Sequence, residues 1–102
     1  MEALSKSEVA DFLAHQLTDW TLKENTIHRD FKFKTFVEAF SFMTAIAFSA
    51  EKMNHHPDWS NSYNRVSVSL TTDEAKGITH LDFDLAAVMN LTWKNYQANV
   101  LT

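Results

Sequence analysis

Two histidines and a glutamate stand close together near the middle of the chain. Glu51 and His55 are four residues apart, so they share one face if this segment is helical, and His56 follows directly. Imidazole titrates near neutral pH, so one histidine can protonate a leaving hydroxyl group while another group accepts a proton from a ring nitrogen. The pattern fits a metal-free dehydration. Histidines at a helix end also often only cap carbonyl groups, and spacing alone favours that structural interpretation.

Other side chains near this cluster leave two further interpretations open. Trp59 and Tyr63 follow the histidines and either offer flat surfaces to a planar heterocycle or simply fill a core. Carboxylates and imidazoles also suit zinc and similar ions. The candidate ligands would be Glu51, His55, His56 and Asp58. We rank the metal hypothesis below acid–base chemistry and expect no metal, because adjacent histidines rarely both reach one ion.

The first third of the chain predicts a helix and a hairpin. Ser5 and Glu8 have the spacing of a capping box, and apolar residues follow at helical intervals to near Leu17. Apolar and polar residues then alternate on both sides of a polar turn over residues 23–25, which predicts two strands. The second strand places one set of side chains on a single face: Ile27, Arg29, Phe31 and Phe33.

The remaining residues predict a long helix, a second hairpin and a last helix. Thr35 and Glu38 suggest a second capping box, and the apolar pattern after them continues to near Met53, before the break at Pro57. Residues 59–63 and 66–70 predict two strands, and Thr79 with Asp82 has the spacing to cap a final helix. The apolar stripe of that helix is Ile78, Leu81, Leu85, Val88 and Tyr96. The predicted fold is α+β in the order αββαββα, a four-stranded antiparallel sheet with three helices on one face.

Composition narrows the classes of function. A length of 102 residues predicts one domain over residues 1–102, and the absence of cysteine suits a reducing cytoplasm. No apolar run is long enough to span a membrane. The net charge of −4, with scattered basic residues, argues against direct nucleic-acid binding. A single glycine rules out a glycine-rich phosphate loop of the kind that carries nucleotides.

The stretch from Glu51 to Trp59, with Tyr63 to Val66 after it, closely resembles the signature of pterin-4a-carbinolamine dehydratases, also known as dimerisation cofactors of a homeodomain transcription factor. The resemblance extends back through residues 40–44 and forward through residues 70–72 and 77–86. It implies the same fold, dimers or tetramers, and loss of the 4a-hydroxyl group from a pterin carbinolamine to give a quinonoid dihydropterin. The resemblance also implies that the reaction needs no cofactor and no metal.

The resemblance also implies roles for individual residues. Glu51, His55 and His56 match catalytic positions of the family, and Asp82 matches an acidic position, although its spacing from Thr79 equally predicts a helix cap. Asp73 stands where many members carry a third catalytic histidine. The expected catalytic residues are His55, His56, Glu51 and Asp73, and the expected substrate-binding residues are Asn54, Pro57, Trp59, Asp82 and His80.

Three positions depart from the family pattern. Asp73 replaces the third histidine, Leu81 replaces a common arginine, and Asn54 replaces an aspartate. A carboxyl group holds no proton to donate near pH 7 unless burial favours its protonated form, so we expect slow turnover unless His80 substitutes for the missing imidazole.

Two functions from different classes therefore compete. The first is a dehydratase acting on a pterin substrate in tetrahydropterin recycling. The second is an inactive or weakly active family member that binds another protein through its long apolar helix and open sheet face. That helix, over residues 36–53, carries more apolar surface than one sheet face and two helices easily cover, so we predict a homodimer or homotetramer.

Overall fold

The elements follow the order helix, two strands, helix, two strands, helix. The structure is a computed structural model and describes residues 1–98. Its helices are α1 (Lys6–Gln16), α2 (Phe36–Met53) and α3 (His80–Ala98), and a short 3-10 turn, η1 (Asp73–Ala75), precedes α3. Its strands are β1 (Thr21–Lys23), β2 (Thr26–Lys32), β3 (Asp58–Ser62) and β4 (Arg65–Leu70). The predicted αββαββα order is confirmed.

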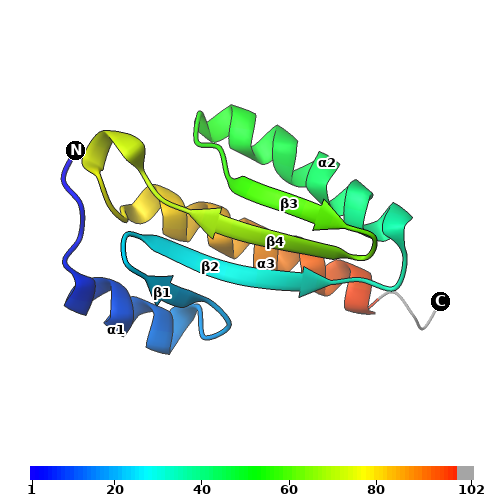
Figure 1. Cartoon of the computed structure of the whole chain (residues 1–102), viewed down its shortest axis with the longest axis horizontal. Coiled ribbons are helices and arrows are strands. Elements are labelled where there is room, and N and C mark those ends of the chain that lie inside the picture. The colour runs from blue at the N-terminus through cyan, green and yellow to red at the C-terminus, as the bar shows by residue number, and fades with distance from the viewer. Residues whose placement is uncertain (99–102) are drawn as a thin grey trace.

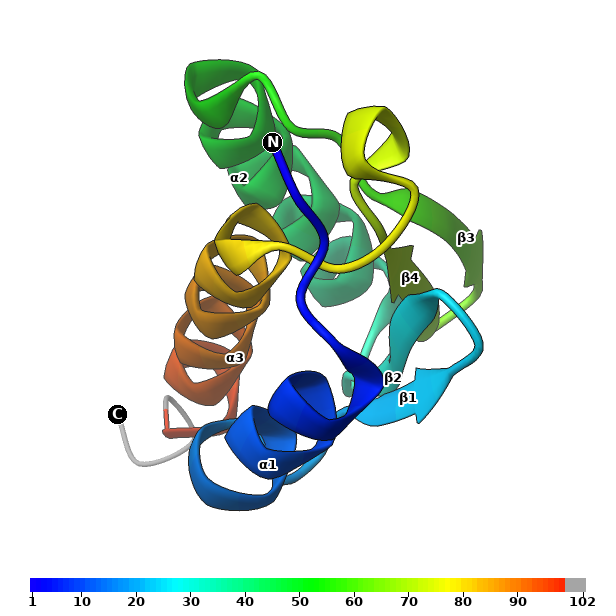
Figure 2. The same cartoon turned by 90° about the vertical axis from the view of Figure 1, so that its left-hand side faces the viewer.

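The four strands form one antiparallel sheet in the order β1-β2-β4-β3. The central strands β2 and β4 pair closely, with Arg29 opposite Val68 and Phe31 opposite Val66. All three helices lie on one face of this sheet, as the two views in Figures 1 and 2 show. The predicted fold class, a four-stranded antiparallel sheet covered by three helices on one face, is therefore confirmed.

The core fills the space between the sheet and the helices. Alternation along β4 turns Val66, Val68 and Leu70 inward, and all three are fully buried. Residues on α2 and α3 complete this core, among them Phe42, Ile46, Leu85, Ala86 and Met89. Burial of each large apolar side chain stabilises the fold by about 1.5–3 kcal/mol relative to an exposed position.

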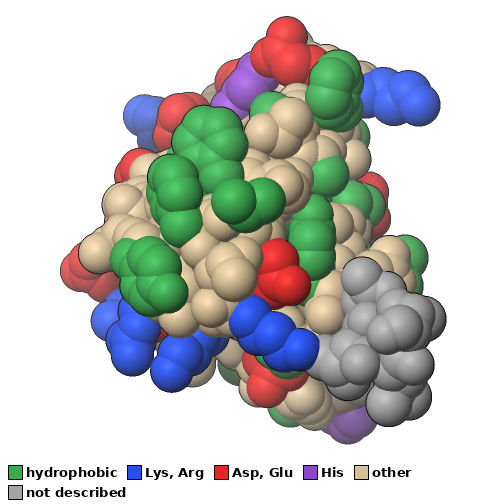
Figure 3. All heavy atoms as spheres, turned by 90° about the vertical axis from the view of Figure 1, so that its right-hand side faces the viewer, with side chains coloured by type: hydrophobic (Ala, Val, Ile, Leu, Met, Phe, Trp, Pro, Cys, Tyr) green, Lys and Arg blue, Asp and Glu red, His purple; other side chains and the backbone are tan. Residues whose placement is uncertain are grey.

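Helix α2 is apolar on both its inner and its outer side. The inner side is spaced by three and four residues and consists of Ala39, Phe42, Ile46 and Ala50. The outer side exposes a set of residues that we call the α2 outer patch: Phe36, Val37, Phe40 and Phe48. Hydrophobic side chains gather in the upper half of the face shown in Figure 3, the half in which Figure 1 places α2.

Two local predictions need correction. Thr35 accepts a hydrogen bond from the Glu38 N–H as predicted, but the Glu38 carboxylate accepts from the N–H of Lys34, so the second capping box is only half formed. The stripe predicted for α3 is also incomplete, because the side chains buried beside Leu85 are Phe83, Ala86 and Met89. Helix α3 lies between α1 and α2 (Figure 2), so it is covered on two sides and its buried arc is wider than one stripe.

The segment before α1 crosses the loop that leads into α3. The N–H of Leu4 donates to the carbonyl oxygen of Ile78 over 2.8 Å. A Cβ atom added to Gly77 would lie 2.8 Å from the Cβ atom of Ala3, so this crossing requires glycine.

Within residues 1–98, no helix is both long enough and apolar enough to cross a membrane.

Candidate active site

The turn at the end of α2 separates the two histidines. Asn54 is the C-cap, with left-handed backbone angles (φ 51°, ψ 42°), and the N–H of His55 donates to the Ala50 carbonyl oxygen over 3.0 Å. Pro57 follows and cannot continue the helix. His55 consequently turns inward, with 8% of its side chain exposed, whereas His56 turns outward, with 55% exposed.

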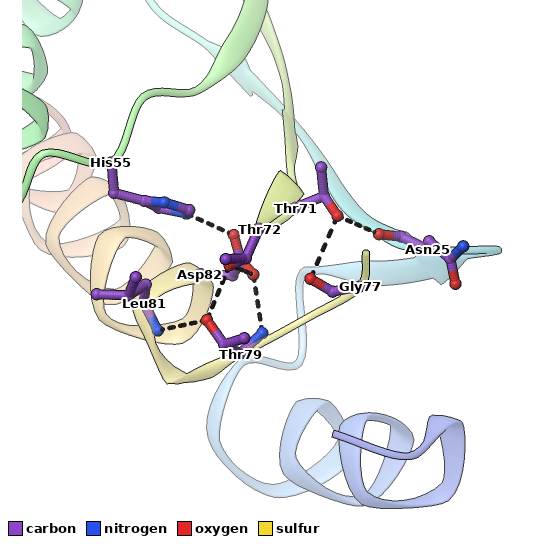
Figure 4. A network of polar contacts seen from close by, with 8 residues as sticks. All are labelled: Asn25, His55, Thr71, Thr72, Gly77, Thr79, Leu81 and Asp82. Carbon is purple, nitrogen blue, oxygen red and sulfur yellow. Dashed lines mark hydrogen bonds and ion pairs between the residues drawn. The ribbon is translucent and has the colours of Figure 1, made fainter. Parts of the chain in front are cut away.

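His55 is bound to the fully buried Asp82 at the start of α3. Its Nε2 donates to Asp82 Oδ1 over 2.6 Å. The other carboxylate oxygen, Oδ2, accepts from Thr72 Oγ1 over 2.8 Å and from the Thr79 N–H over 3.0 Å (Figure 4). Oδ2 thus forms the helix cap that the spacing from Thr79 predicted, while Oδ1 orients the imidazole of His55. Asp82 itself is fully buried, and its assignment to the substrate site remains a prediction. A buried carboxylate that accepts three hydrogen bonds in this way is held rigidly.

Two threonines complete this network, and sequence spacing does not reveal both. The Thr72 and Thr79 hydroxyl groups lie 2.8 Å apart, and Thr79 Oγ1 also accepts from the N–H of Leu81 over 3.2 Å. Thr79 was predicted as a helix cap. Thr72 lies two residues after the end of β4, and no spacing in that segment indicates that its hydroxyl group meets Asp82, ten residues further along the chain.

His56 forms a second histidine–carboxylate pair, with Glu51. Its Nε2 donates to Glu51 Oε2 over 2.5 Å, and both side chains are largely exposed. Exposed pairs of this kind contribute little to stability, about 0–1 kcal/mol. The pair therefore orients the imidazole less firmly than the buried carboxylate orients His55.

Cavities surround the two histidines. One of about 360 Å³ and one of about 140 Å³ are both lined by His56, Thr71 and Asp73, and His55 lines the smaller one as well. A third cavity, of about 360 Å³, is lined by His55, Asn54 and Leu81 among others. Each histidine thus lines two cavities.

Several predicted residues meet at these cavities. Asp73 is exposed at the start of η1 and lines the two cavities that His56 also lines. Pro57 lines the larger of these, and Asn54 lines both the smaller one and the third cavity, which His55 also lines. Sequence and structure therefore select the same end of the molecule.

Two predicted substrate-binding residues lie elsewhere. Trp59 is half buried in β3 and packs against the hydrophobic core, which favours the core-filling interpretation over a substrate surface. His80 is exposed, its ring packs edge-on against Phe83 with centroids 5.8 Å apart, and it lines none of the cavities around His55. A substrate role for either residue remains a prediction.

The geometry of His55 and His56 differs from that of two ligands of one metal ion. In the part of the chain that the structure describes, no three His, Asp or Glu side chains are grouped so that they could hold a metal ion. The Nε2 atoms of His55 and His56 each point to a separate carboxylate, Asp82 and Glu51.

The pairing of both imidazoles through Nε2 determines what they can do. Because a carboxylate accepts the Nε2 hydrogen, a neutral imidazole in this position has its free lone pair on Nδ1. Nδ1 of His55 has no partner among residues 1–98, yet no buried polar atom in that range lacks one, so this nitrogen is accessible from the cavities. Each histidine can therefore accept a proton at Nδ1, and its carboxylate stabilises the resulting cation.

The fold and this site define a class of protein: an α+β protein with paired histidines at the junction of a long helix and an antiparallel sheet. The family model described as pterin 4 alpha carbinolamine dehydratase matches residues 2–92. A protein of Rhizobium meliloti (strain 1021), whose name places it provisionally among the pterin-4-alpha-carbinolamine dehydratases, is 52% identical over 91 residues, which cover 87% of this chain and 86% of the relative. The chain belongs to the pterin-4a-carbinolamine dehydratase family.

Solved structures agree with this assignment. The crystal structure of a transcriptional coactivator/pterin dehydratase from Brucella melitensis superposes with a TM-score of 0.85 at 42% identity, over 89% of this chain and 98% of that one. A pterin dehydratase-like protein, described as a RuBisCO assembly factor in the alpha-carboxysome, gives a TM-score of 0.61 at 17% identity, over 72% and 86% of the two chains. The second likeness shows the fold alone.

Proposed function

We propose that this protein dehydrates a 4a-hydroxytetrahydropterin to the quinonoid dihydropterin by general acid–base catalysis. The observation that supports this function best is the pair of histidines, each bound to a carboxylate through Nε2, beside cavities of about 360 and 140 Å³. The family supports the pterin substrate class.

The reaction needs one proton to leave the substrate and one to reach its hydroxyl group. A base takes the proton from the ring nitrogen next to carbon 4a, and the electrons of that N–H bond form the new C=N bond. The C–O bond breaks, and an acid protonates the departing oxygen to give water. No electrons are gained or lost overall, so two proton-transfer groups suffice.

We assign the base and the acid from the environments of the two imidazoles. His55 is held in a fixed orientation by the buried Asp82, which leaves the Nδ1 lone pair free to accept the substrate proton. His56 is exposed and paired with Glu51, so it exchanges protons with solvent and is suited to protonate the leaving hydroxyl group. Asp73 lines the same cavities as His56 and acts as an anchor or secondary base.

The test is a direct dehydration assay on synthetic carbinolamine. His55→Ala and His56→Ala should each lower turnover by about 10²-fold or more while the fold persists. His15→Ala is the matched control, because His15 is exposed on α1 and lines none of the cavities around His55 and His56. Unchanged turnover in both site variants would exclude the assignment.

The context that we propose is tetrahydropterin recycling in the cytoplasm by a homodimer or homotetramer. The α2 outer patch supports the oligomer, since exposed apolar side chains that gather on one helix are typical of a protein contact surface.

The same patch favours a second candidate function. A family member with little activity would act as an interaction module whose protein partner contacts α2, and the name of the Brucella protein includes a coactivator role. An inert protein that still forms oligomers would support this module over the dehydratase.

A further inference from the structure

A charged side chain is buried inside the sheet–helix layer, far from the histidines. Arg29 lies on the inward face of β2 between Ile27 and Phe31, and only 8% of it is exposed. Arginine is rarely buried to this extent unless it is fully paired. Burial lowers the pKa of the Arg29 guanidinium, and the charge of Asp19 opposes that shift only in part. The local structure therefore leaves this cation incompletely neutralised.

The Arg29 guanidinium packs against two aromatic rings and donates one hydrogen bond, from Nη1. Its central carbon lies 4.4 Å from the centroid of the Phe31 ring and 4.7 Å from that of Trp93, so aromatic rings are packed against it. Nη1 donates to Asn90 Oδ1 over 2.7 Å, and the same oxygen accepts from Trp20 Nε1 over 2.9 Å. These contacts fix the plane of the guanidinium and its orientation.

The other donors of this guanidinium have no acceptor among residues 1–98. Asp19 approaches Nη1 only to 3.6 Å, beyond a good hydrogen bond, and its own side chain is 67% exposed. Every fully enclosed polar side-chain atom in the described residues has a partner. Nε and Nη2 of Arg29 must therefore reach open space, and the space that this side chain lines is a cavity of about 330 Å³.

This cavity has a mixed lining that suits an organic anion. Leu17, Leu91 and the Trp93 ring give it apolar walls, and Lys94 adds a second positive charge. With Asp19 counted, the three charged side chains sum to one net positive charge. Asn90 lies about 12 Å further along the α3 axis than Asp82, at a rise of about 1.5 Å per residue, so the cavity is separate from the histidine site.

We propose that this cavity binds a small organic monocarboxylate, whose two oxygens accept from Nε and Nη2 of Arg29. A planar guanidinium edge matches a carboxylate with two parallel hydrogen bonds. The single net charge suits a monoanion better than a phosphate dianion, and the apolar walls accommodate a hydrocarbon or ring substituent. The bound carboxylate replaces the loose contact with Asp19.

The three tryptophans make this proposal measurable in the intact chain. Trp93 lines the cavity and Trp20 is bonded to Asn90, whereas Trp59 lies in β3, at the opposite edge of the sheet from β1. Benzoate titrated at constant ionic strength should shift the indole N–H signals of Trp20 and Trp93 saturably, with a Kd in the millimolar range, about 1 mM, and leave Trp59 unmoved. Acetate should bind more weakly, and inorganic phosphate more weakly still.

Substitutions distinguish a specific carboxylate-binding site from nonspecific attraction of anions to positive charge. Arg29→Lys keeps the charge but loses the planar fork and should weaken benzoate at least about 10-fold. Arg65→Lys is the matched control, on an exposed arginine outside the cavity, and should change nothing. Asp19→Asn removes the competing carboxylate from an exposed loop position and should tighten binding several-fold.

Several results would overturn the proposal. These are the absence of a saturable shift, equal shifts at Trp59, tighter binding of phosphate than of benzoate, or benzoate affinity unchanged in Asp19→Asn. The last variant alters an exposed side chain, so it tests the idea even if Arg29→Lys fails to fold.

Discussion

Replacement of Asp82 should separate the stability of the site from its chemistry. Asp82→Ala removes the acceptor for His55 Nε2, Thr72 Oγ1 and the Thr79 N–H. The Thr72 hydroxyl keeps its contact with Thr79 Oγ1, so two buried donors lose their partner. At about 1–3 kcal/mol for each unsatisfied group, the free energy of unfolding should fall by about 2–6 kcal/mol. This is a large share of the stability of a domain of this size, about 5–15 kcal/mol.

Asp82→Asn should affect stability little and turnover strongly. The amide oxygen can still accept from Thr72 and from the Thr79 N–H, so the loss is about 1 kcal/mol, or about 4–8 °C in Tm. The amide nitrogen, however, faces His55 Nε2 and forces the proton of a neutral imidazole onto Nδ1. The nitrogen that should accept the substrate proton is then blocked, and we expect turnover to fall by about 10²–10⁴-fold.

Thermal unfolding by circular dichroism and the dehydration assay measure the two effects on the same samples. Nitrogen NMR of the imidazole reports the position of its proton directly. Asp84→Asn is the matched control on an exposed position of α3 and should change neither quantity. If Asp82→Asn retains turnover within about threefold of the wild type, the argument from the His55 tautomer is wrong.

Four further predictions concern other parts of the molecule. Asp73→His should raise turnover about 10-fold by supplying an imidazole beside His56, as the dehydration assay would show. Phe48→Glu in the α2 outer patch should shift the mass in light scattering from an oligomer to a monomer. Gly77→Ala should destabilise the fold by about 1–3 kcal/mol in urea unfolding, because the new methyl group meets Ala3 at 2.8 Å. The Ser5 N–H donates to the Glu8 carboxylate and, together with the Ser5 side chain, lowers the pKa of Glu8 below its ordinary value. The resulting stabilisation is present above the ordinary pKa and is lost as the pH falls through the lower, folded pKa, so Glu8→Gln should flatten this acid decline.

Each of these four has an outcome that would contradict it. The Asp73 argument is wrong if both Asp73→His and Asp73→Asn leave turnover unchanged. A wild-type protein that is already monomeric at micromolar concentration removes the basis of the Phe48 prediction. Combining Ala3→Gly with Gly77→Ala should restore stability, and failure to do so would show that the clash lies elsewhere. Identical pH profiles for the wild type and Glu8→Gln would mean that Ser5 does not hold the carboxylate.

The sequence predicted the fold well because each element carries its own local signal. Periodicities of two and of three to four residues marked the strands and helices, and Ser5 with Glu8 forms the complete capping box that their spacing indicated. The inward set on β2 was also correct, Arg29 included. The α3 face was harder to predict, since a helix between two neighbours buries more than one stripe.

The sequence could indicate where a candidate site lies along the chain, but not the hydrogen bonds that hold its side chains. The Glu51, His55 and His56 spacing located it, because these residues are neighbours in the sequence. The bond from His55 to Asp82 joins residues 27 apart, and a pairing at that separation depends on how α2 and α3 pack. Trp59 shows the converse limit, since an aromatic residue next to a site in sequence can face the core.

The crossing of the N-terminal segment over Gly77 has a practical consequence for protein production. Leu4 is tied to Ile78, and Met1 lines the cavity of about 360 Å³ that His55 also lines. An affinity tag fused directly to Met1 would therefore begin at the mouth of that cavity. Such a tag would lie beside His55, so removal of the tag, rather than a change of buffer or assay, is the appropriate first response to a preparation with low turnover.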